Sequence, residues 1–144
     1  MKSGLLKATY LTLEGKEAIK TFFSGGALVG SLHCVMKKEA LPFGAVALQG
    51  SSLFSFSLED LRACAKTDLE LANELIERLI QVALVKERRE REFLTLSPYE
   101  RYCSLRDQAP EILENVTQAD IVLYLGVTPV ALSRMKGRAM RSKN

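Results

Sequence analysis

Apolar and polar positions alternate along the first third of the chain and then change to a helical spacing. The alternation is clearest at Leu6, Ala8 and Tyr10, and it predicts a strand with one buried face. A Glu-Gly turn signal at 14–15 and an apolar run over 18–23 predict the return strand of a hairpin. Further short strands are predicted over residues 28–29, 43–48 and 53–56. The stretch 31–41 fits either a helical turn or a loop, so we expect residues 1–57 to form a β region.

A helical spacing of apolar residues follows, over residues 58–93. Ser57 and Thr67 each precede an acidic residue by three positions, which predicts capping of a short helix and then of a long one. The long helix is apolar over too broad a surface for a solvated helix, so one face should pack on the β region and another on a partner chain. The residues predicted for this dimer interface are Ala72, Leu75, Ile76, Leu79, Val82, Ala83 and Lys86. The mixed-charge run 86–92 is interpreted as a solvated continuation of the helix.

The last region, residues 94–144, predicts a further group of helices. Ser97 and Glu100 have the spacing of a capping box, and Pro98 stands at the first helical position, where its missing N–H is not needed. The helix that starts there should end before Pro110. No segment rich in Gly, Ser or Pro separates the three regions, 1–57, 58–93 and 94–144.

The strongest pattern in the chain is a pair of short helices from Thr117 onward. Thr117 is placed to cap the first helix, with the Asp120 side chain reaching back to it. Gly126 tolerates the positive φ that follows a helix end, and Thr128 with Pro129 suits the start of a second helix. The apolar residues that the pair should bury are Ile121, Leu125, Val127, Leu132 and Met135. This is a helix-turn-helix pattern, in which the second helix would enter the major groove of DNA.

Positive charge is concentrated at the C-terminal end. The segment from Ile121 onward has no acidic residue and five basic ones, which are Arg134, Lys136, Arg138, Arg141 and Lys143. The rest of the chain then holds 15 of the 20 basic residues against all 17 acidic ones, so the net charge of +3 conceals a basic patch on a slightly acidic body. A phosphate backbone attracts such a patch through counterion release. A solvated basic tail is the alternative, but the patterned helix pair beside it favours DNA binding.

Composition narrows the class of protein. The apolar content of 47% is ordinary for a globular chain. No apolar run reaches the ~18 residues of a membrane span, and the first residues do not resemble a signal peptide, so we predict a cytoplasmic protein without membrane contact. The three cysteines, Cys34, Cys64 and Cys103, are interpreted as free buried thiols. Since no nucleophile–base pair, metal-ligand spacing or phosphate loop is present, we predict no enzyme activity, no metal and no cofactor.

The order of a β region, a long helix and a helix-turn-helix resembles the Crp/Fnr family of bacterial transcription regulators. The matching stretches are residues 11–17, 22–23, 28–31, 42–48, 58–61, 94–102 and the block from Val116 onward. The most specific are the Ser-x-x-Glu-Arg-Tyr motif at 97–102 and the helix pair at its distance from that motif. The resemblance implies an α+β fold with a cyclic-nucleotide-binding-like β-roll, a long dimerisation helix and a C-terminal helix-turn-helix. It also implies a homodimer on double-stranded DNA, with RNA polymerase as a further candidate partner.

Two departures from the family concern the β-roll, which serves as the sensor domain in that family. The resemblance begins midway through the β-roll, so we expect only a partial antiparallel β-roll, whose open edges should be covered by a partner chain, by strand exchange or by residues missing from this sequence. Nucleotide-binding members have a glutamate after the glycine that matches Gly30, and this chain has Ser31 there. Leu41 and Pro42 stand where those members have an arginine and a small hydroxyl residue for the cyclic phosphate. An effector other than cyclic AMP is therefore expected, and its identity stays open.

The resemblance also assigns roles to residues of the second helix. Val130 stands at the position of an acidic residue and would touch a thymine methyl, Arg134 would pair with guanine, and Ser133 would make a secondary contact. The remaining cations would hold phosphates. The predicted DNA-binding residues are Thr117, Thr128, Val130, Ser133, Arg134, Lys136, Arg138 and Arg141. The competing interpretation is a truncated dimerisation or protein-interaction module that does not bind DNA.

Overall fold

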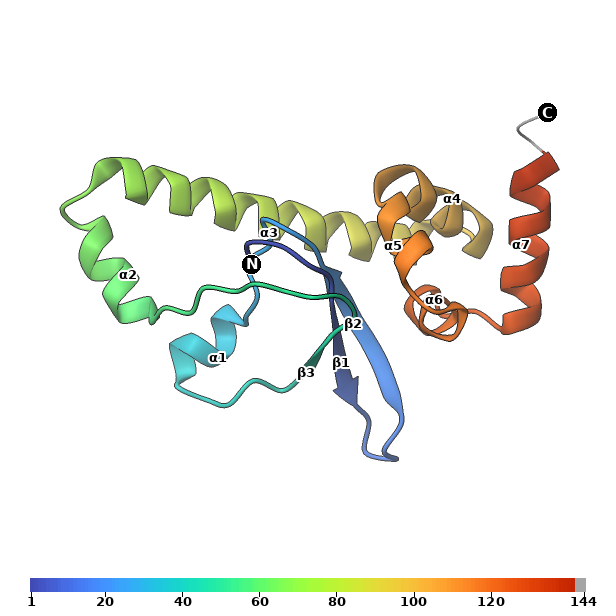
Figure 1. Cartoon of the computed structure of the whole chain (residues 1–144), viewed down its shortest axis with the longest axis horizontal. Coiled ribbons are helices and arrows are strands. Elements are labelled where there is room, and N and C mark those ends of the chain that lie inside the picture. Colours follow the sequence, from blue (N-terminus) through green and yellow to red (C-terminus); the bar gives the residue numbers. More distant parts are fainter. Residues whose placement is uncertain (142–144) are drawn as a thin grey trace.

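The computed structural model describes residues 1–141 of the chain, in which a small sheet lies beside one long helix and a group of shorter helices (Figure 1). Within this part the elements are β1 (Leu6–Leu11), β2 (Glu17–Phe23), α1 (Leu32–Lys37), β3 (Gly44–Ala47), α2 (Leu58–Ala65), α3 (Leu69–Thr95), α4 (Pro98–Gln108), α5 (Pro110–Asn115), α6 (Gln118–Leu125) and α7 (Pro129–Arg141). The sheet lies below the C-terminal half of α3 in Figure 1, and helices α4 to α7 gather at the C-terminal end of α3.

The sheet is antiparallel and has the strand order β2-β1-β3. The predicted hairpin is confirmed, because Leu6 pairs with Phe23 and Leu11 with Glu17, with one register shift after Ala8. Gly15 has a φ of 74° at the turn, where its N–H donates to the Thr12 carbonyl. The α+β class and the partial antiparallel β-roll predicted from the sequence are therefore both present.

Two of the predicted strands are wrong. Residues 28–29 and 53–56 belong to no strand, and only an isolated bridge between Ser3 and Ser52 lies near the second of them. An extended segment becomes a strand only when a neighbour takes its backbone hydrogen bonds, and the sheet of residues 1–141 ends at β2 and β3. Within the ambiguous stretch 31–41, α1 forms with Ser31 as its N-cap.

The long helix begins one residue later than its predicted cap implies. Asp68, not Thr67, is the N-cap of α3, and its carboxylate accepts a hydrogen bond from the Leu71 N–H at 2.9 Å. A carboxylate at this position also faces the positive end of the helix dipole. The Thr67 hydroxyl instead donates to the Cys64 carbonyl at 3.2 Å. The helix ends at Thr95, two residues beyond the predicted end.

Helix α3 has one face towards the sheet and another away from the rest of the chain. Arg78 donates to the Gly26 carbonyl at 3.5 Å, and Arg89 donates to the carbonyls of Lys20 and Ile19. Leu75 and Val82 are half-buried and share this side by helical spacing. We call the opposite, exposed set the outward stripe, which consists of Leu69, Ile76, Leu79, Ile80, Ala83 and Leu84.

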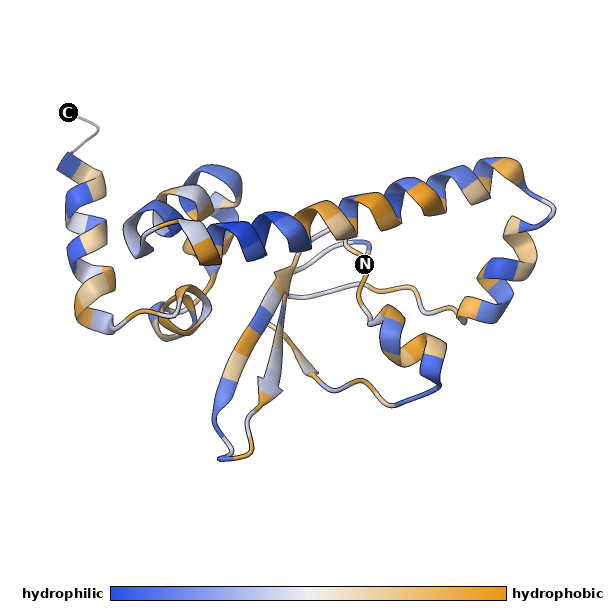
Figure 2. Cartoon of the chain, turned by 180° about the vertical axis from the view of Figure 1, so that it is seen from behind, coloured by the Kyte–Doolittle hydropathy of each residue, from blue (hydrophilic) through white to orange (hydrophobic). Residues whose placement is uncertain are grey.

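The predicted dimer residues therefore divide between two environments. Ile76, Leu79, Ala83 and Lys86 are exposed, whereas Ala72, Leu75 and Val82 are half-buried within their own chain. Figure 2 shows apolar residues along the first part of α3 and hydrophilic residues towards its C-terminal end.

One hydrophobic core joins the sheet to the C-terminal helices. Leu5 precedes β1, and Ile19 and Phe22 of β2 are buried in the same cluster as residues from α4, α6 and α7. The C-terminal members of this cluster are Tyr102, Leu105, Val116, Ile121, Leu125, Leu132, Met135 and Ala139. The position of the helix pair is therefore set partly by the sheet.

Helix α4 begins with the capping box predicted from the sequence. The Ser97 hydroxyl accepts from the Glu100 N–H, and the Glu100 carboxylate accepts from the Ser97 N–H at 2.8 Å and from the Ser97 hydroxyl at 2.7 Å. The side-chain hydrogen bond from Ser97 and the backbone one hold the pKa of Glu100 below its usual value of 4.5. The α3–α4 connection is thus only Leu96 and Ser97, two residues between two well-defined helix ends.

Candidate nucleic-acid interface

The helix-turn-helix predicted from the sequence is formed by α6 and α7. Thr117 accepts from the Asp120 N–H at 3.1 Å, and Gly126 follows α6 in the left-handed region with a φ of 66°. Thr128 accepts from the Ala131 N–H at 3.2 Å at the start of α7. Ile121 and Leu132 are each 1% exposed, and Leu125 and Met135 are also buried, as predicted. The two helices therefore pack through the apolar positions that their spacing indicates.

Asp120 has a different partner from the one predicted. Its carboxylate does not reach back to the Thr117 backbone, but accepts from the Lys7 ammonium of β1 at 2.9 Å. Lys7 also lies 3.5 Å from Glu17, and the side chains of Lys7 and Asp120 are only 14% and 10% exposed. The hydrogen bond to Asp120 raises the pKa of Lys7 above its ordinary value of 10.5. A nearly buried ion pair therefore ties the first helix of the pair to the central strand of the sheet.

Aromatic and polar contacts complete this junction. The centres of the Phe22 and Tyr124 rings lie 5.1 Å apart. The Tyr124 ring has a second contact with the Arg89 guanidinium, which lies 4.3 Å from the ring centre. The Gln49 amide donates to the Asn115 side chain at 2.6 Å. The helix pair is thus fixed to the sheet and to α3, as well as to α4.

Replacing Lys7 by methionine should lower the free energy of unfolding by about 1.5–3 kcal/mol, the usual value of a hydrogen bond to a charged group. The methionine leaves the nearly buried Asp120 carboxylate without its cation, and an unpaired buried charge destabilises the folded state. Urea titration followed by circular dichroism measures the effect. Because the folded pKa of Lys7 is raised, the stabilisation is complete below pH 10.5 and is lost as the pH rises through the higher folded value.

The matched control is Lys16→Met. Lys16 also pairs with a carboxylate, that of Glu14 at 2.7 Å, but both side chains are largely exposed, and such pairs contribute about 0–1 kcal/mol. Equal losses for the two variants would contradict the importance given to the Lys7–Asp120 pair.

The face of α7 that points away from the core carries the predicted contact residues. Val130 is 61% exposed, and Ser133, Arg134 and Arg141 are exposed as well. Positions 130, 134, 137 and 141 recur at helical spacing, so they share one side of the helix. Lys136 is half-buried on its flank, and Thr117 and Thr128 are exposed at the starts of α6 and α7. Lys143, the fifth basic residue of this end, lies outside the described residues.

No carboxylate in residues 1–141 forms an ion pair with Arg134, Lys136 or Arg141. The acidic residues that form ion pairs in this part of the chain are Glu14, Glu17, Glu39, Glu59, Glu74, Asp107 and Asp120, and none of them lies on α7. An exposed helix face with uncompensated positive charge attracts polyanions.

Arg138 has a contact that the sequence does not indicate. Its guanidinium lies 4.2 Å from the centre of the Tyr99 ring, on the first turn of α4. Tyr99 and Arg138 are 39 positions apart, so no spacing rule could have paired them. The stacked guanidinium keeps its N–H donors at its edge, where they can still contact a phosphate.

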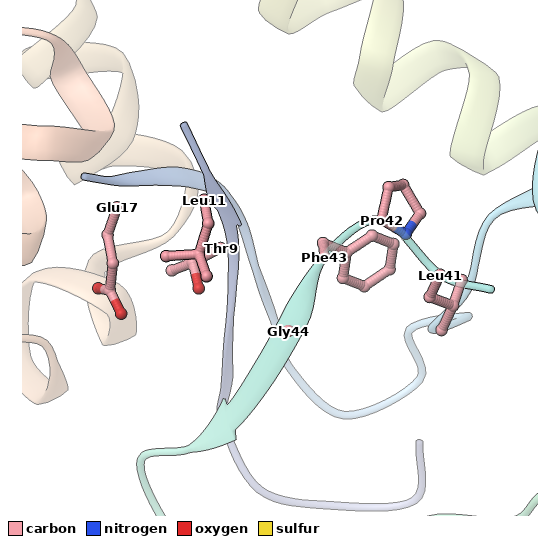
Figure 3. A pocket seen from close by; sticks show the side chains of 7 residues that line it. All are labelled: Thr9, Leu11, Glu17, Leu41, Pro42, Phe43 and Gly44. Atoms are coloured by element: carbon pink, nitrogen blue, oxygen red, sulfur yellow. The ribbon is translucent and has the colours of Figure 1, made fainter. Parts of the chain in front are cut away.

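A shallow hollow of about 390 Å³ lies beside β1 and β3 (Figure 3). Its lining residues are Thr9, Leu11, Glu17, Leu41, Pro42, Phe43 and Gly44. Leu41 and Pro42, which the sequence resemblance assigns to the positions of the family's phosphate-binding residues, lie at one end of it, and Glu17 supplies a carboxylate at the other. Its lining residues include no cation, and the Lys20 ammonium lies 4.1 Å from the centre of the Phe43 ring. An effector other than cyclic AMP stays a prediction.

The cysteines and possible metal ligands are dispersed. Cys34 is buried and Cys103 is half-buried, but Cys64 is exposed on α2, so the prediction of a buried thiol is wrong there. Helix α2 buries none of its residues, which explains the exposure. Across residues 1–141, no group of three or more His, Cys, Asp or Glu side chains is placed to hold a metal ion. No helix of this part is long and apolar enough to span a bilayer.

Comparison with solved structures identifies the architecture. A protein from Eubacterium rectale, assigned as a transcriptional regulator of the Crp/Fnr family, superposes with a TM-score of 0.67 at 20% identity, over 99% of this chain and 68% of the other. CprK in complex with OCPA superposes with a TM-score of 0.65 at 20% identity, over 97% and 67%. The chain has the Crp/Fnr fold. No protein-family model and no curated protein matches the sequence.

A third structure agrees with this result. A Silicibacter pomeroyi protein assigned as a cAMP-binding regulatory protein superposes on the Crp/Fnr fold of this chain with a TM-score of 0.54 at 17% identity, over 96% of this chain and 64% of that one. The chain thus spans about two thirds of the length of these neighbours. The resemblance inferred from the sequence motifs is confirmed at the level of the fold.

Proposed function

We propose that this chain is a sequence-specific DNA-binding transcription regulator of Crp/Fnr type, which acts in the cytoplasm as a homodimer. The observation that carries the proposal is the outward face of α7, which is exposed and cationic on a helix whose other side buries Leu132, Met135 and Ala139. A helix held in this way can enter a major groove without losing its own core contacts. The fold of the neighbours supports the same function.

The exposed side chains suit the two kinds of contact that DNA recognition needs. Arg134 can donate two hydrogen bonds to guanine, and Val130 beside it can touch a thymine methyl, with Ser133 as a secondary contact. Lys136, Arg138 and Arg141 would bind phosphates and fix the register. Thr117 and Thr128 lie at helix N-termini, where backbone N–H groups can bind a phosphate of the DNA backbone.

Dimerisation would occur through the outward stripe of α3. Ile76 is 54% exposed and Ile80 is 44% exposed, so this stripe leaves large apolar side chains in water in the isolated chain. Two-fold pairing of α3 would present two α7 helices to a pseudo-palindromic site, about 34 Å or one duplex turn apart.

Selection from a random duplex library tests the proposal. The protein should enrich a pseudo-palindromic sequence, and Arg134→Ala should lose discrimination at one base pair of each half-site by about 1–3 kcal/mol. Gel-shift titration of the enriched duplex and its single-base variants measures that loss. Lys136→Ala is the matched control, because the loss of a phosphate contact should weaken all duplexes similarly and flatten the salt dependence.

Two outcomes would contradict this assignment. An Arg134→Ala protein with unchanged base preference would remove Arg134 from its reading role. Failure of the unaltered protein to enrich any duplex would favour the competing hypothesis of a dimerisation or protein-interaction module.

A further inference from the structure

One arginine joins three elements that meet beside the helix pair. Arg101 of α4 donates from Nη1 to the Leu96 carbonyl at 2.9 Å, in the connection that follows α3. It also donates from Nη2 to the carbonyl of Leu125, the last residue of α6, at 3.1 Å. The guanidinium therefore bridges the α3–α4 connection and the turn of the helix-turn-helix.

The last turn of α3 takes part in the same contact. The Arg101 guanidinium lies 4.5 Å from the centre of the Phe93 ring. The Phe93 ring in turn lies against Gly126, where a Cβ atom would come within 3.2 Å of its Cζ atom. Gly126 also has a φ of 66°, so both its conformation and its lack of a side chain allow this approach. The C-terminal end of α3 thus touches the turn that precedes α7, which we call the reading helix.

The contact depends on the shape of the guanidinium. The last carbonyls of a helix have no partner within the helix, and Leu125 is one of these. A planar fork can donate to two carbonyls at once, whereas an ammonium on a flexible stem matches two fixed acceptors less well. The Arg101 Nε is buried and has no acceptor among the described residues, and the residue as a whole is half-buried.

We propose that Arg101 is a positioning residue that fixes the angle between α3 and α7, and with it the spacing of the two reading helices. The proposal rests on the proposed function, because spacing matters only in a dimer on DNA. In a two-fold dimer an angular error of one chain is repeated in its partner, so the separation of the reading helices is sensitive to this angle. Arg101 reaches base contacts only through α7 and touches no DNA itself.

The test compares binding to one half-site and to two. The probes are the duplex selected by the unaltered protein, versions with the half-sites moved by one to three base pairs, and a duplex with one half-site. The unaltered protein should prefer one spacing. Arg101→Met should lower affinity for the preferred spacing about 10- to 100-fold, the equivalent of lost hydrogen bonds to a charged group, and should bind the single half-site unchanged. The affinity of Arg101→Lys for the preferred spacing should fall between those of the unaltered protein and Arg101→Met.

Arg106→Met is the control on the same helix. Arg106 pairs with the adjacent Asp107 at 2.7 Å, so its loss should leave the spacing preference intact. An Arg101→Met protein that keeps the spacing preference overturns the proposal. So does an equal loss on one and two half-sites, which would show that Arg101 only stabilises the helix pair.

A measurement without DNA separates this proposal from the proposed function. Spin labels are attached at Glu77→Cys of α3 and Met140→Cys of α7, which are both exposed positions. Cys64 and Cys103 are replaced by serine so that they take no label. Dilution of labelled chains with unlabelled ones ensures that the measured distance lies within one chain. The distance distribution should be narrow with Arg101 and broad with Arg101→Met. Equally narrow distributions overturn the proposal, whereas an absence of DNA binding with a broadened distribution contradicts only the proposed function.

Discussion

Replacing Ile76 and Ile80 together by glutamate is expected to convert the proposed homodimer into a monomer. About half of each side chain is exposed on the outward stripe, and in a dimer this part would transfer from water into the contact. Full burial of an isoleucine contributes about 1.5–3 kcal/mol, so each of the four isoleucines of two chains would contribute about half of that value. The loss of roughly 3–6 kcal/mol corresponds to about two to four orders of magnitude in the dissociation constant.

Sedimentation velocity across a concentration series measures this change directly. The double variant should also bind a two-half-site duplex no better than a single half-site, because the linked second contact is gone. Glu77→Ala with Gln81→Ala is the control, since these exposed positions lie on α3 beside the stripe, not within it. A double isoleucine variant that still sediments as a dimer would remove the outward stripe from the interface.

Truncation of Leu132 to alanine should have the largest effect on folding. Leu132 is 1% exposed and lies in the cluster that joins α7 to α6, α4 and the sheet. A buried leucine replaced by alanine costs about 2–5 kcal/mol, because a cavity remains in addition to the lost burial. Since small domains have only about 5–15 kcal/mol of stability, a large share of the free energy of unfolding should be lost.

Chemical denaturation with urea provides the free energy of unfolding of this variant. Val130→Ala is the matched control on the same helix, because Val130 is exposed and its truncation should change stability by less than about 0.5 kcal/mol. The prediction fails if the two alanine variants have the same midpoint and slope.

Features that depend on near neighbours in the chain were predictable from the residues alone. A capping serine needs only the N–H three positions later, which is why Ser57 and Ser97 were assigned correctly. The turn at Gly126 and the buried face of α6 and α7 follow from the same short distances. Even here, two adjacent side chains can compete for the role of N-cap, and at the start of α3 the N-cap is Asp68 instead of Thr67.

Features that depend on distant partners were not predictable. Asp120 has the right spacing for a capping box, but Lys7 is 113 positions away and takes its carboxylate. The apolar segments 28–29 and 53–56 have strand-like composition without a neighbouring strand to pair with. Leu75 and Val82 could be assigned to an apolar surface of α3, but not to the side that faces its own chain.

By itself, the sequence determined the helix-turn-helix, its capping threonines and the basic character of its outer face, because each arises from residues within a few turns of one another. Only the tertiary structure decided where that pair of helices stands. The Lys7–Asp120 ion pair, the Phe22–Tyr124 contact and the bridge from Arg101 to Leu96 and Leu125 all join segments that are distant along the chain or in different elements. Their partners are selected by the packing of the shared core, which a local pattern does not encode.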